Sequence, residues 1–281
     1  MARAVRRSTL LTTLAIVAGL LVVYIAVLVL YALSGSDDHP DDRSPSADGV
    51  LVYLDVDTVE GSEYSLGGHV SVYPGSNLLN ADGTLEEDLF IDVAPMIADQ
   101  QLEFAAGTRP GVRPVSLYTY GDIRTWPFDH YSTESVSIRG FSEVDDVQIP
   151  LETEVAVTDS LTGWDIDAGD DKTGDGQAVS IEASRSAGSV IFDLALCVML
   201  VVLPVCTLFV AIQTVRRRKA FQPPMVTWFA VMLFAVLPLR NIFPGAPPFG
   251  SWVDYTVVLW VVAGLVTAMA LYVFAWWRQA P

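Results

Sequence analysis

The sequence predicts an α+β membrane protein, with four transmembrane helices plus an extracytoplasmic antiparallel β-sandwich between the first two. Apolar residues make up 52% of the 281 positions and charged residues only 17%, which is too apolar for an ordinary soluble domain. Residues 34–188, by contrast, contain 31 acidic and 7 basic residues, an excess of 24 negative charges. This uneven distribution separates an acidic, water-facing part from apolar segments suited to lipid.

Hydropathy, charge and turn composition set the predicted boundaries. They are a cytoplasmic N-terminus at 1–9, a transmembrane helix at 10–33, an acidic flexible stalk at 34–49, the β-sandwich at 50–188, helices at 189–215, 225–243 and 252–277, a basic cytoplasmic loop at 216–224, an outer turn at 244–251 and a cytoplasmic C-terminus at 278–281. A span needs ~20 apolar residues, a length that the third helix approaches only by continuing through Phe243.

The first apolar segment, residues 10–33, contains no charged residue over 24 positions. The apolar core of a cleaved signal peptide spans ~7–15 residues, so this longer run predicts an uncleaved signal anchor. Three arginines among the first seven residues would hold the N-terminus in the cytoplasm. Alternation of the four helices then places the basic residues 216–219 and Arg278 inside too, in a plasma membrane with both termini cytoplasmic.

The acidic part after the stalk is predicted to be β-structure. Short runs rich in Val, Ile, Thr, Tyr and Phe are separated by turn residues, which is typical of an antiparallel sandwich. Residues 96–104 are predicted as one short helix, and residues 34–49 are too polar and acidic to fold. The predicted strands are residues 50–57, 69–73, 89–93, 115–120, 135–141, 152–158 and 179–184.

Composition also argues against several classes of function. The acidic outer part lacks the basic face that phosphate binding requires, so no nucleic-acid partner is expected. Cys197 and Cys206 lie nine positions apart in one helix, ~13 Å along its axis, which is too far for a disulfide. The three histidines are scattered and the sequence contains no catalytic motif, so the chain is not expected to be an enzyme.

The turn at residues 125–131 (TWPFDHY) concentrates aromatic side chains around one carboxylate and one imidazole. Two interpretations fit it. The turn is a plug that packs on the sandwich, or it is a loop that seats the β-domain on the membrane helices, where aromatic rings with a polar group are favoured. The candidate residues for this coupling of domain to membrane are Trp126, Phe128, Asp129, Tyr131 and Arg185.

Several short motifs together resemble a known family. They are Trp126 to Tyr131, Arg185-Ser186, Arg240-Asn241, Pro244-Gly245, Pro247-Pro248 and Gly250. Their order of helix, β-domain, basic turn and final helix resembles the four-pass membrane proteins catalogued as domain of unknown function 4436, over nearly the whole chain after the stalk. The resemblance implies an integral membrane protein and leaves its activity open.

A weaker resemblance is architectural. The Pro-Phe-Asp turn is similar to the loop at the domain–membrane boundary of pentameric ligand-gated ion channels. In that family the turn aspartate pairs with an arginine just before the first membrane helix, and Asp129 and Arg185 match that pattern. The chain departs from the family in its helix before the sandwich, in having only three helices after it, and in lacking a cysteine pair around the loop. The helix that would line a pore has almost no polar residue besides Thr227, which disfavours conduction.

Residues 165–182 carry five aspartates within eleven positions. The spacing of Asp171, Thr173, Asp175 and Glu182 resembles a twelve-residue calcium loop. Thr173 is a weak ligand for its position and no helices flank the loop, so the alternative is a solvated acidic hairpin. No other cofactor is predicted.

Three ionisable residues, Asp193, Arg240 and Asp254, lie near the outer ends of the predicted helices. Charges inside membrane segments tend to find partners, so we expect Arg240 to pair with Asp254 or Asp193. Such a cluster would serve as a structural clamp or as a proton or ion relay. Within the helices, Pro204 and Pro238 each remove a backbone hydrogen bond and should produce kinks.

These features predict an anchored outer sensing or scaffold domain that is seated on its own helix bundle. Its partners would be the lipid bilayer and an envelope protein or small ligand at the outer domain, and homo-oligomerisation stays open. The alternative is a transport or ion-channel-like component.

Overall fold

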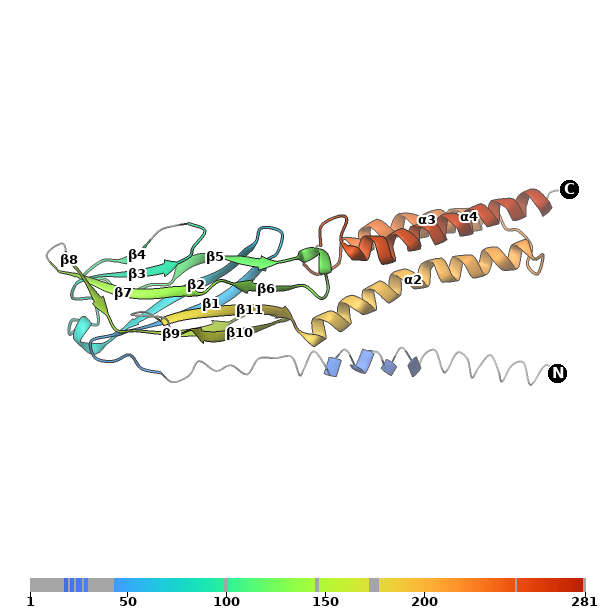
Figure 1. Cartoon of the computed structure of the whole chain (residues 1–281). Helices are drawn as coiled ribbons and strands as arrows, with labels where there is room; N and C mark the ends of the chain where they lie inside the picture. The colour runs from blue at the N-terminus through green and yellow to red at the C-terminus, as the bar shows by residue number, and fades with distance from the viewer. Residues whose placement is uncertain are drawn as a thin grey trace.

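The computed structural model describes residues 18–19, 21–22, 24–26, 28–29, 43–98, 101–144, 147–171, 177–245 and 247–279. The molecule is elongated. All the labelled strands lie at one end, and the long helices extend away from the other end (Figure 1).

In the described part of the chain, eleven strands form one sheet. Their order across the sheet is β4-β3-β7-β11-β6-β5-β2-β1-β9, with β10 beside β11 and β8 beside β7. The strands are β1 (Val50–Glu60), β2 (Ser65–Pro74), β3 (Asp88–Ala94), β4 (Leu102–Phe104), β5 (Arg113–Gly121), β6 (His130–Thr133), β7 (Val136–Val144), β8 (Val147–Leu151), β9 (Thr153–Asp159), β10 (Trp164–Asp171) and β11 (Gln177–Arg185).

The sheet is mixed, which corrects the purely antiparallel arrangement expected from the sequence. β1 and β9 run parallel, with Val50 opposite Thr153 and Val56 opposite Asp159. The other strand pairs that the structure describes are antiparallel. A hairpin forces its two strands to be antiparallel, whereas parallel neighbours need a longer crossover. Since β2 to β8 separate β1 from β9 in the chain, no hairpin constrains the direction of β9.

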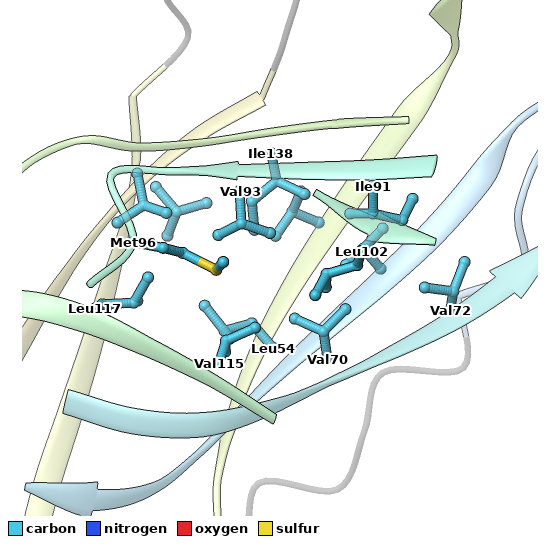
Figure 2. Close-up of a cluster of buried hydrophobic side chains, with 14 of the residues drawn as sticks. Leu54, Val70, Val72, Ile91, Val93, Met96, Leu102, Val115, Leu117 and Ile138 are labelled. Carbon is cyan, nitrogen blue, oxygen red and sulfur yellow. The ribbon is translucent and has the colours of Figure 1, made fainter. Parts of the chain in front are cut away.

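The sheet folds over so that two groups of strands face each other across a shared core. Figure 2 shows labelled side chains from β1, β2 and β5 pointing toward side chains from β3, β4 and β7. Along β1, Val52, Leu54 and Val56 are buried, whereas Tyr53 and Asp55 between them are partly exposed. This period of two is the pattern by which the sequence predicts a strand with one face in a core.

The seven predicted strand segments coincide with β1, β2, β3, β5, β7, β9 and β11. The helix predicted at residues 96–104 is wrong, because β4 occupies its end and Met96 forms an isolated β-bridge with Leu117. Leu102 and Phe104 are buried with exposed Glu103 between them. That alternation places them on one face of a strand, which a helix could not do.

The acidic segment before β1 is more ordered than its composition predicts. Ser46 donates a hydrogen bond to Glu152 at 2.8 Å, and Asn77 donates one to Asp48 at 2.7 Å. The backbone N–H of Gly75 donates to the carbonyl of Gly49 at 2.8 Å. Residues 43–49 are therefore fixed to the strands, which corrects the flexible stalk over that part, while residues 34–42 lie outside the described residues.

Three long helical segments follow the strands. They are α2 (Ala187–Val215), α3 (Pro224–Arg240), and a π-helix, η3 (Asp254–Val258), that continues into α4 (Leu259–Gln279). Within the described residues, α2 and the combined segment Asp254–Gln279 are long and apolar enough to cross a membrane. α3 has 17 residues and ends at Arg240, three residues before its predicted end.

Among the described residues, two of the four predicted spans correspond to helices of spanning length. Of the predicted first helix, only residues 18–19, 21–22, 24–26 and 28–29 are described, and these are helical. In α2 and α4 the most apolar stretches are only 28% and 22% buried. The exposed side chains on the helices include Val198, Met199, Phe209, Phe234 and Trp260. A core helix of a soluble protein would bury such side chains, so the outer surface of this bundle needs an apolar environment.

α2 and α4 pack closely where Gly264 faces Pro204. A Cβ atom added at Gly264 would lie 2.8 Å from the Cβ of Pro204, too near for an ordinary contact. Pro204 has no N–H to continue the hydrogen-bond ladder of α2, and the Thr207 hydroxyl donates to the carbonyls of Leu203 and Pro204, both at 3.0 Å. The glycine thus lets the two helices approach at this turn.

Replacing Gly264 by Leu should destabilise the helix bundle by roughly 1–3 kcal/mol, because the added side chain overpacks the contact with Pro204. The measurement is thermal unfolding of the purified full chain in mild detergent, followed by circular dichroism. Ala263→Leu is the matched control, because Ala263 is the exposed neighbour on the same helix. Equal loss of stability in both variants would contradict the role of this contact.

Candidate functional site

The aromatic turn lies between a short 3-10 helix, η2 (Ile123–Thr125), and β6, at the end of the sheet that meets the helices (Figure 1). Trp126 is fully buried and stacks on Phe243, with ring centroids 4.8 Å apart. Its indole Nε1 donates a hydrogen bond to the carbonyl of Pro244 at 2.9 Å. Trp126 therefore belongs to the apolar cluster of the helices, together with residues such as Val236 and Val253.

Phe128 makes the second aromatic contact of this turn. The residue is 57% exposed, and its ring stacks on Trp252 with centroids 6.3 Å apart. Both contacts lead away from the core of the sheet and onto residues around the α3–α4 connection. Of the two interpretations of the turn, these contacts agree with a loop that seats the strands on the helices.

A buried ion pair joins the same turn to the end of β11. Arg185 donates from Nε to Asp129 Oδ1 at 2.5 Å and from Nη2 to Asp129 Oδ2 at 3.1 Å. The two side chains are only 5% and 1% exposed. A bidentate guanidinium–carboxylate contact in such a place is geometrically specific, and breaking it leaves a buried charge without its partner.

Tyr131 supports the carboxylate of this pair. Its hydroxyl donates to Asp129 Oδ2 at 3.0 Å. Burial raises the pKa of the Tyr131 phenol well above its usual value, and the adjacent Asp129 charge raises it further. The phenol therefore stays protonated and keeps donating. Its ring fits against Gly61 and Gly121, where neither backbone leaves room for a Cβ atom.

The Arg185 guanidinium is also held on its other sides. Its central carbon lies 4.7 Å from the centroid of the Trp164 ring, a cation–π contact, and Trp164 is its cross-strand neighbour in β10. Gly245, at φ +73°, approaches so closely that a Cβ atom there would lie 2.6 Å from Arg185 Nη2. The loop after α3 therefore needs a glycine at this position for two reasons, its backbone conformation and the space that Arg185 occupies.

A second carboxylate, Asp193, approaches Arg185 from α2. Its Oδ2 lies 3.9 Å from Arg185 Nη1, and the side chain is fully buried. Neither carboxylate oxygen of Asp193 accepts a hydrogen bond from any residue in the described ranges. Since Asp129 already neutralises Arg185, an ionised Asp193 would add a buried negative charge without a cation of its own. Burial of such a charge is costly.

The remaining charges of the predicted cluster form a separate clamp. Arg240 donates from Nε and Nη2 to Asp254, both at 3.1 Å, and from Nη2 to the carbonyl of Pro247 at 2.7 Å. The backbone N–H of Gly250 also donates to Asp254, at 2.8 Å. Arg240 thus pairs with Asp254, one of the two expected partners, while Asp193 lies beside Arg185 instead.

The acidic stretch proposed for calcium is mainly a hairpin. Asp171 lies opposite Ala178, whereas Glu182 lies opposite Asp167. Four residue steps along β11, ~13 Å, therefore separate Glu182 from the position that faces Asp171. Thr173 and Asp175 are outside the described residues. This register does not favour Glu182 as the closing ligand, and the calcium site stays a prediction. Among the residues that the structure does describe, no three acidic, His or Cys side chains gather as metal ligands.

A cavity of about 360 Å³ opens at the junction of strands and helices. Its walls come from the end of β1 and the turn after it, η2, the aromatic turn with the start of β6, the β9–β10 turn, the end of β11 with the start of α2, and the loop after α3. Residues from both halves of the molecule therefore line one space, among them Glu60, Asp129, Tyr131, Trp164, Arg185 and Gly245.

Several residues at the junction are not identifiable from the sequence. Trp164 stands beside an acidic stretch whose composition indicates a loop. Nothing in the sequence therefore predicts its contact with Arg185. Gly61, Gly121 and Gly245 look like ordinary turn glycines until the neighbours that need their space are known. Alternation of Trp164, Ile166 and Ala168 is the one feature that could have indicated β10.

The buried pair should give a strongly non-additive double-mutant cycle. With Asp129→Asn, Arg185→Gln and the double variant, we expect a coupling on the order of 2 kcal/mol in the free energy of unfolding, because either single change leaves the other group buried and unpaired. The exposed pair Asp122 and Arg124, 2.8 Å apart, is the matched control and should give small, salt-screened coupling. Additive effects at the buried pair would contradict its role.

Asp193→Asn should stabilise the full chain, because the amide keeps the shape of the side chain and removes an unbalanced buried charge. We expect a gain on the order of 1 kcal/mol, or about 2–4 °C in Tm. Thermal unfolding in detergent measures it. Asp254→Asn is the control, and it should lower the Tm because Arg240 loses its carboxylate partner. A lower Tm for both variants would show that Asp193 is balanced by another group.

Comparison with known families divides the chain at the end of β11. A model of a domain of unknown function (DUF8686) matches residues 185–279, and a model of a domain of unknown function (DUF4436) matches residues 40–183. The second match corrects the extent of the resemblance expected from the motifs, since it ends before the helices. No curated protein matches the chain. The DUF4436 match covers more than half of the sequence, and the chain belongs to that family.

Proposed function

We propose that the chain is an integral membrane protein whose acidic β-domain is an anchored sensing or scaffold domain, seated outside the membrane on its own helix bundle. The observation that carries this proposal is the buried junction. Trp126 is inserted among the helices, while Arg185 joins the aromatic turn to β11 immediately before α2. A change in the position of the β-domain would therefore move the helices with it.

Placement in the membrane is supported by the outer surface of the bundle. α2 and the segment Asp254–Gln279 are long, apolar and mostly unburied. Residues 10–33 would supply a further span, and α3 with the turn after it a fourth. The basic connection between α2 and α3 lies at the end of the bundle remote from the strands (Figure 1), where Arg217 donates to the carbonyl of Arg278 at 3.2 Å. Basic residues favour the cytoplasmic side, which puts the strands outside.

A binding role fits the junction better than catalysis. Asp129 and Arg185 saturate each other, and Tyr131 donates to the same carboxylate. These groups are thus occupied with holding the structure together, whereas a catalytic acid or base must exchange a proton with a substrate. We infer a non-enzymatic protein whose partners are the bilayer and an envelope protein or small ligand at the β-domain. The exposed apolar faces of the helices would also allow self-association of the chain.

The orientation can be tested by labelling single cysteines in a background where Cys197 and Cys206 are replaced by Ala. Glu86→Cys lies on the β-domain and Arg218→Cys in the basic connection, and both native side chains are exposed. A membrane-impermeant maleimide should label Glu86→Cys in intact spheroplasts, and Arg218→Cys only after permeabilisation. Resistance of the protein to alkaline carbonate extraction is the accompanying check. Labelling of Arg218→Cys in intact cells would overturn the orientation.

Reconstitution into liposomes separates the proposed role from transport. The purified chain should show no selective ion flux, because the described residues of α3 are almost entirely apolar and offer no wettable path. Reproducible, selective conductance would replace the proposal with the channel-like alternative.

A further inference from the structure

The end of the helix bundle that is remote from the strands concentrates positive charge (Figure 1). We call residues 216–219, in the connection between α2 and α3, and Arg278, near the end of α4, the basic end. We propose that the basic end binds the phosphate group of an anionic phospholipid. The inference rests on the proposed placement in the membrane, which puts this end at the cytoplasmic surface, but its chemistry comes from the residues themselves.

The basic end has no acidic side chain near it. Residues 216–219 are three arginines and a lysine, and Arg278 adds a further positive charge. After residue 193 the sequence contains a single acidic residue, Asp254, which is paired at the other end of the bundle. Asp193 itself lies ~35 Å from Arg216 along the axis of α2, far beyond the ~8 Å screening length at physiological salt. These positive charges are therefore available to an external anion.

Most of the side chains at the basic end are free to bind a ligand. Arg216, Arg218 and Lys219 are exposed, and their side chains form no hydrogen bond or ion pair with other residues that the structure describes. Arg217 uses Nη2 as a donor to the carbonyl of Arg278, at 3.2 Å, which keeps the two basic segments together. A guanidinium group presents a planar fork of N–H donors that matches the oxygens of a phosphate.

The connection that carries these side chains is fixed against α4. Gln279 donates from Nε2 to the carbonyl of Thr214 at 2.8 Å and accepts from the N–H of Phe221 at 3.1 Å. The Tyr272 hydroxyl accepts from the N–H of Gln222 and donates to its carbonyl, both at 3.0 Å. These contacts hold the chain on both sides of the basic residues, so little ordering of the backbone is needed when a ligand binds.

Arg217 occupies a backbone position that favours glycine. Its φ is +55°, and its N–H donates to the carbonyl of Thr214 at 3.0 Å. The N–H of Arg218 donates to the carbonyl of Gln213 at the same distance, which completes a Schellman motif at the end of α2. A left-handed conformation is unfavourable for a residue with a Cβ atom. Glycine would fit this backbone better, so the contribution of the arginine lies in its guanidinium group.

A lipid fits the basic end better than a soluble anion does. The Arg278 guanidinium lies over the ring of Phe274, 5.7 Å from its centroid, and Phe274 is itself exposed. Trp276 and Trp277, next to Arg278 in α4, are exposed too. Tryptophan rings favour the headgroup level of a bilayer, and clusters of about 4–8 basic residues at the cytoplasmic end of a membrane helix attract anionic lipids. One lipid molecule would thus contact the cations with its phosphate and the rings with its apolar part.

The test is native mass spectrometry of the purified full chain, released from detergent that contains equal amounts of phosphatidylglycerol and phosphatidylcholine with the same acyl chains. We expect the protein to retain phosphatidylglycerol preferentially, and the preference should fall as the salt concentration of the sample rises. Arg218→Gln should lower the preference about fivefold, the effect of one basic residue near an anionic surface. Arg124→Gln is the matched control, because it removes the same charge from an exposed site on the β-domain, and it should leave the preference unchanged.

Arg217→Gly separates loss of the site from loss of folding. Because glycine suits the left-handed backbone, this variant should have an unchanged or higher Tm in detergent, yet it should lower the preference for phosphatidylglycerol as Arg218→Gln does. Glycerol 3-phosphate, which has the phosphate but no acyl chains, distinguishes a lipid from a soluble ligand. In large excess it should not displace phosphatidylglycerol.

Equal retention of the two lipids, equal effects of Arg218→Gln and Arg124→Gln, or an unchanged preference in Arg217→Gly would overturn the proposal. Displacement of the lipid by glycerol 3-phosphate would overturn it too, because the ligand would then be a soluble phosphate. The cysteine-labelling test of orientation is carried out on whole cells, so failure of lipid selectivity in detergent is distinct from failure of the proposed function.

Discussion

The burial of one guanidinium group is the constraint on which the junction depends. Arg185 stands where the last strand ends and α2 is about to begin, and its charge is removed from water by residues of both halves. A buried cation is tolerated only with a well-placed counter-charge and with its donors occupied. Asp129 supplies the charge, Tyr131 orients Asp129, and Trp164 covers the guanidinium face. The position of the aromatic turn follows from this requirement.

The second ion pair solves a similar problem in another way. Arg240 and Asp254 close the loop between α3 and η3, with the carbonyl of Pro247 and the N–H of Gly250 completing the contacts. The positive and negative charges balance there, and these contacts tie the end of α3 to the start of η3. Beside Arg185 the balance is incomplete, because Asp193 adds a second carboxylate.

Much of the fold could be predicted because its physical signals are local. Alternating apolar residues indicate β1 and β11, and the length of the apolar runs indicates α2 and α4. The pairing of Asp129 with Arg185 could be expected from the motif that they share with a known architecture. The pairing of Arg240 with a nearby carboxylate could be expected, because a charge in an apolar segment needs a counter-charge and few are within reach.

The remaining features depend on contacts distant in sequence. β10 is difficult to recognise from the sequence, because the aspartates on its exposed face make the segment resemble a polar loop. The parallel pairing of β9 with β1 has no local signal, and neither does the entry of Trp126 into the helix cluster rather than the sheet core. Residues 43–49 look disordered by composition, yet hydrogen bonds to Glu152 and Gly75 fix them. In each case tertiary contacts override a local preference.

The seam between the two family matches falls between Ala183 and Arg185, and it divides the buried pair. Asp129 lies within the first match and Arg185 opens the second. A fragment that ends at that seam would keep the Asp129 carboxylate but lose the guanidinium that neutralises it. The complementary fragment would keep the Arg185 guanidinium without its carboxylate partner. Each module alone therefore contains a charged group whose counter-charge lies in the other module. A β-domain and a helix bundle can form this junction only when each supplies its half of the ion pair.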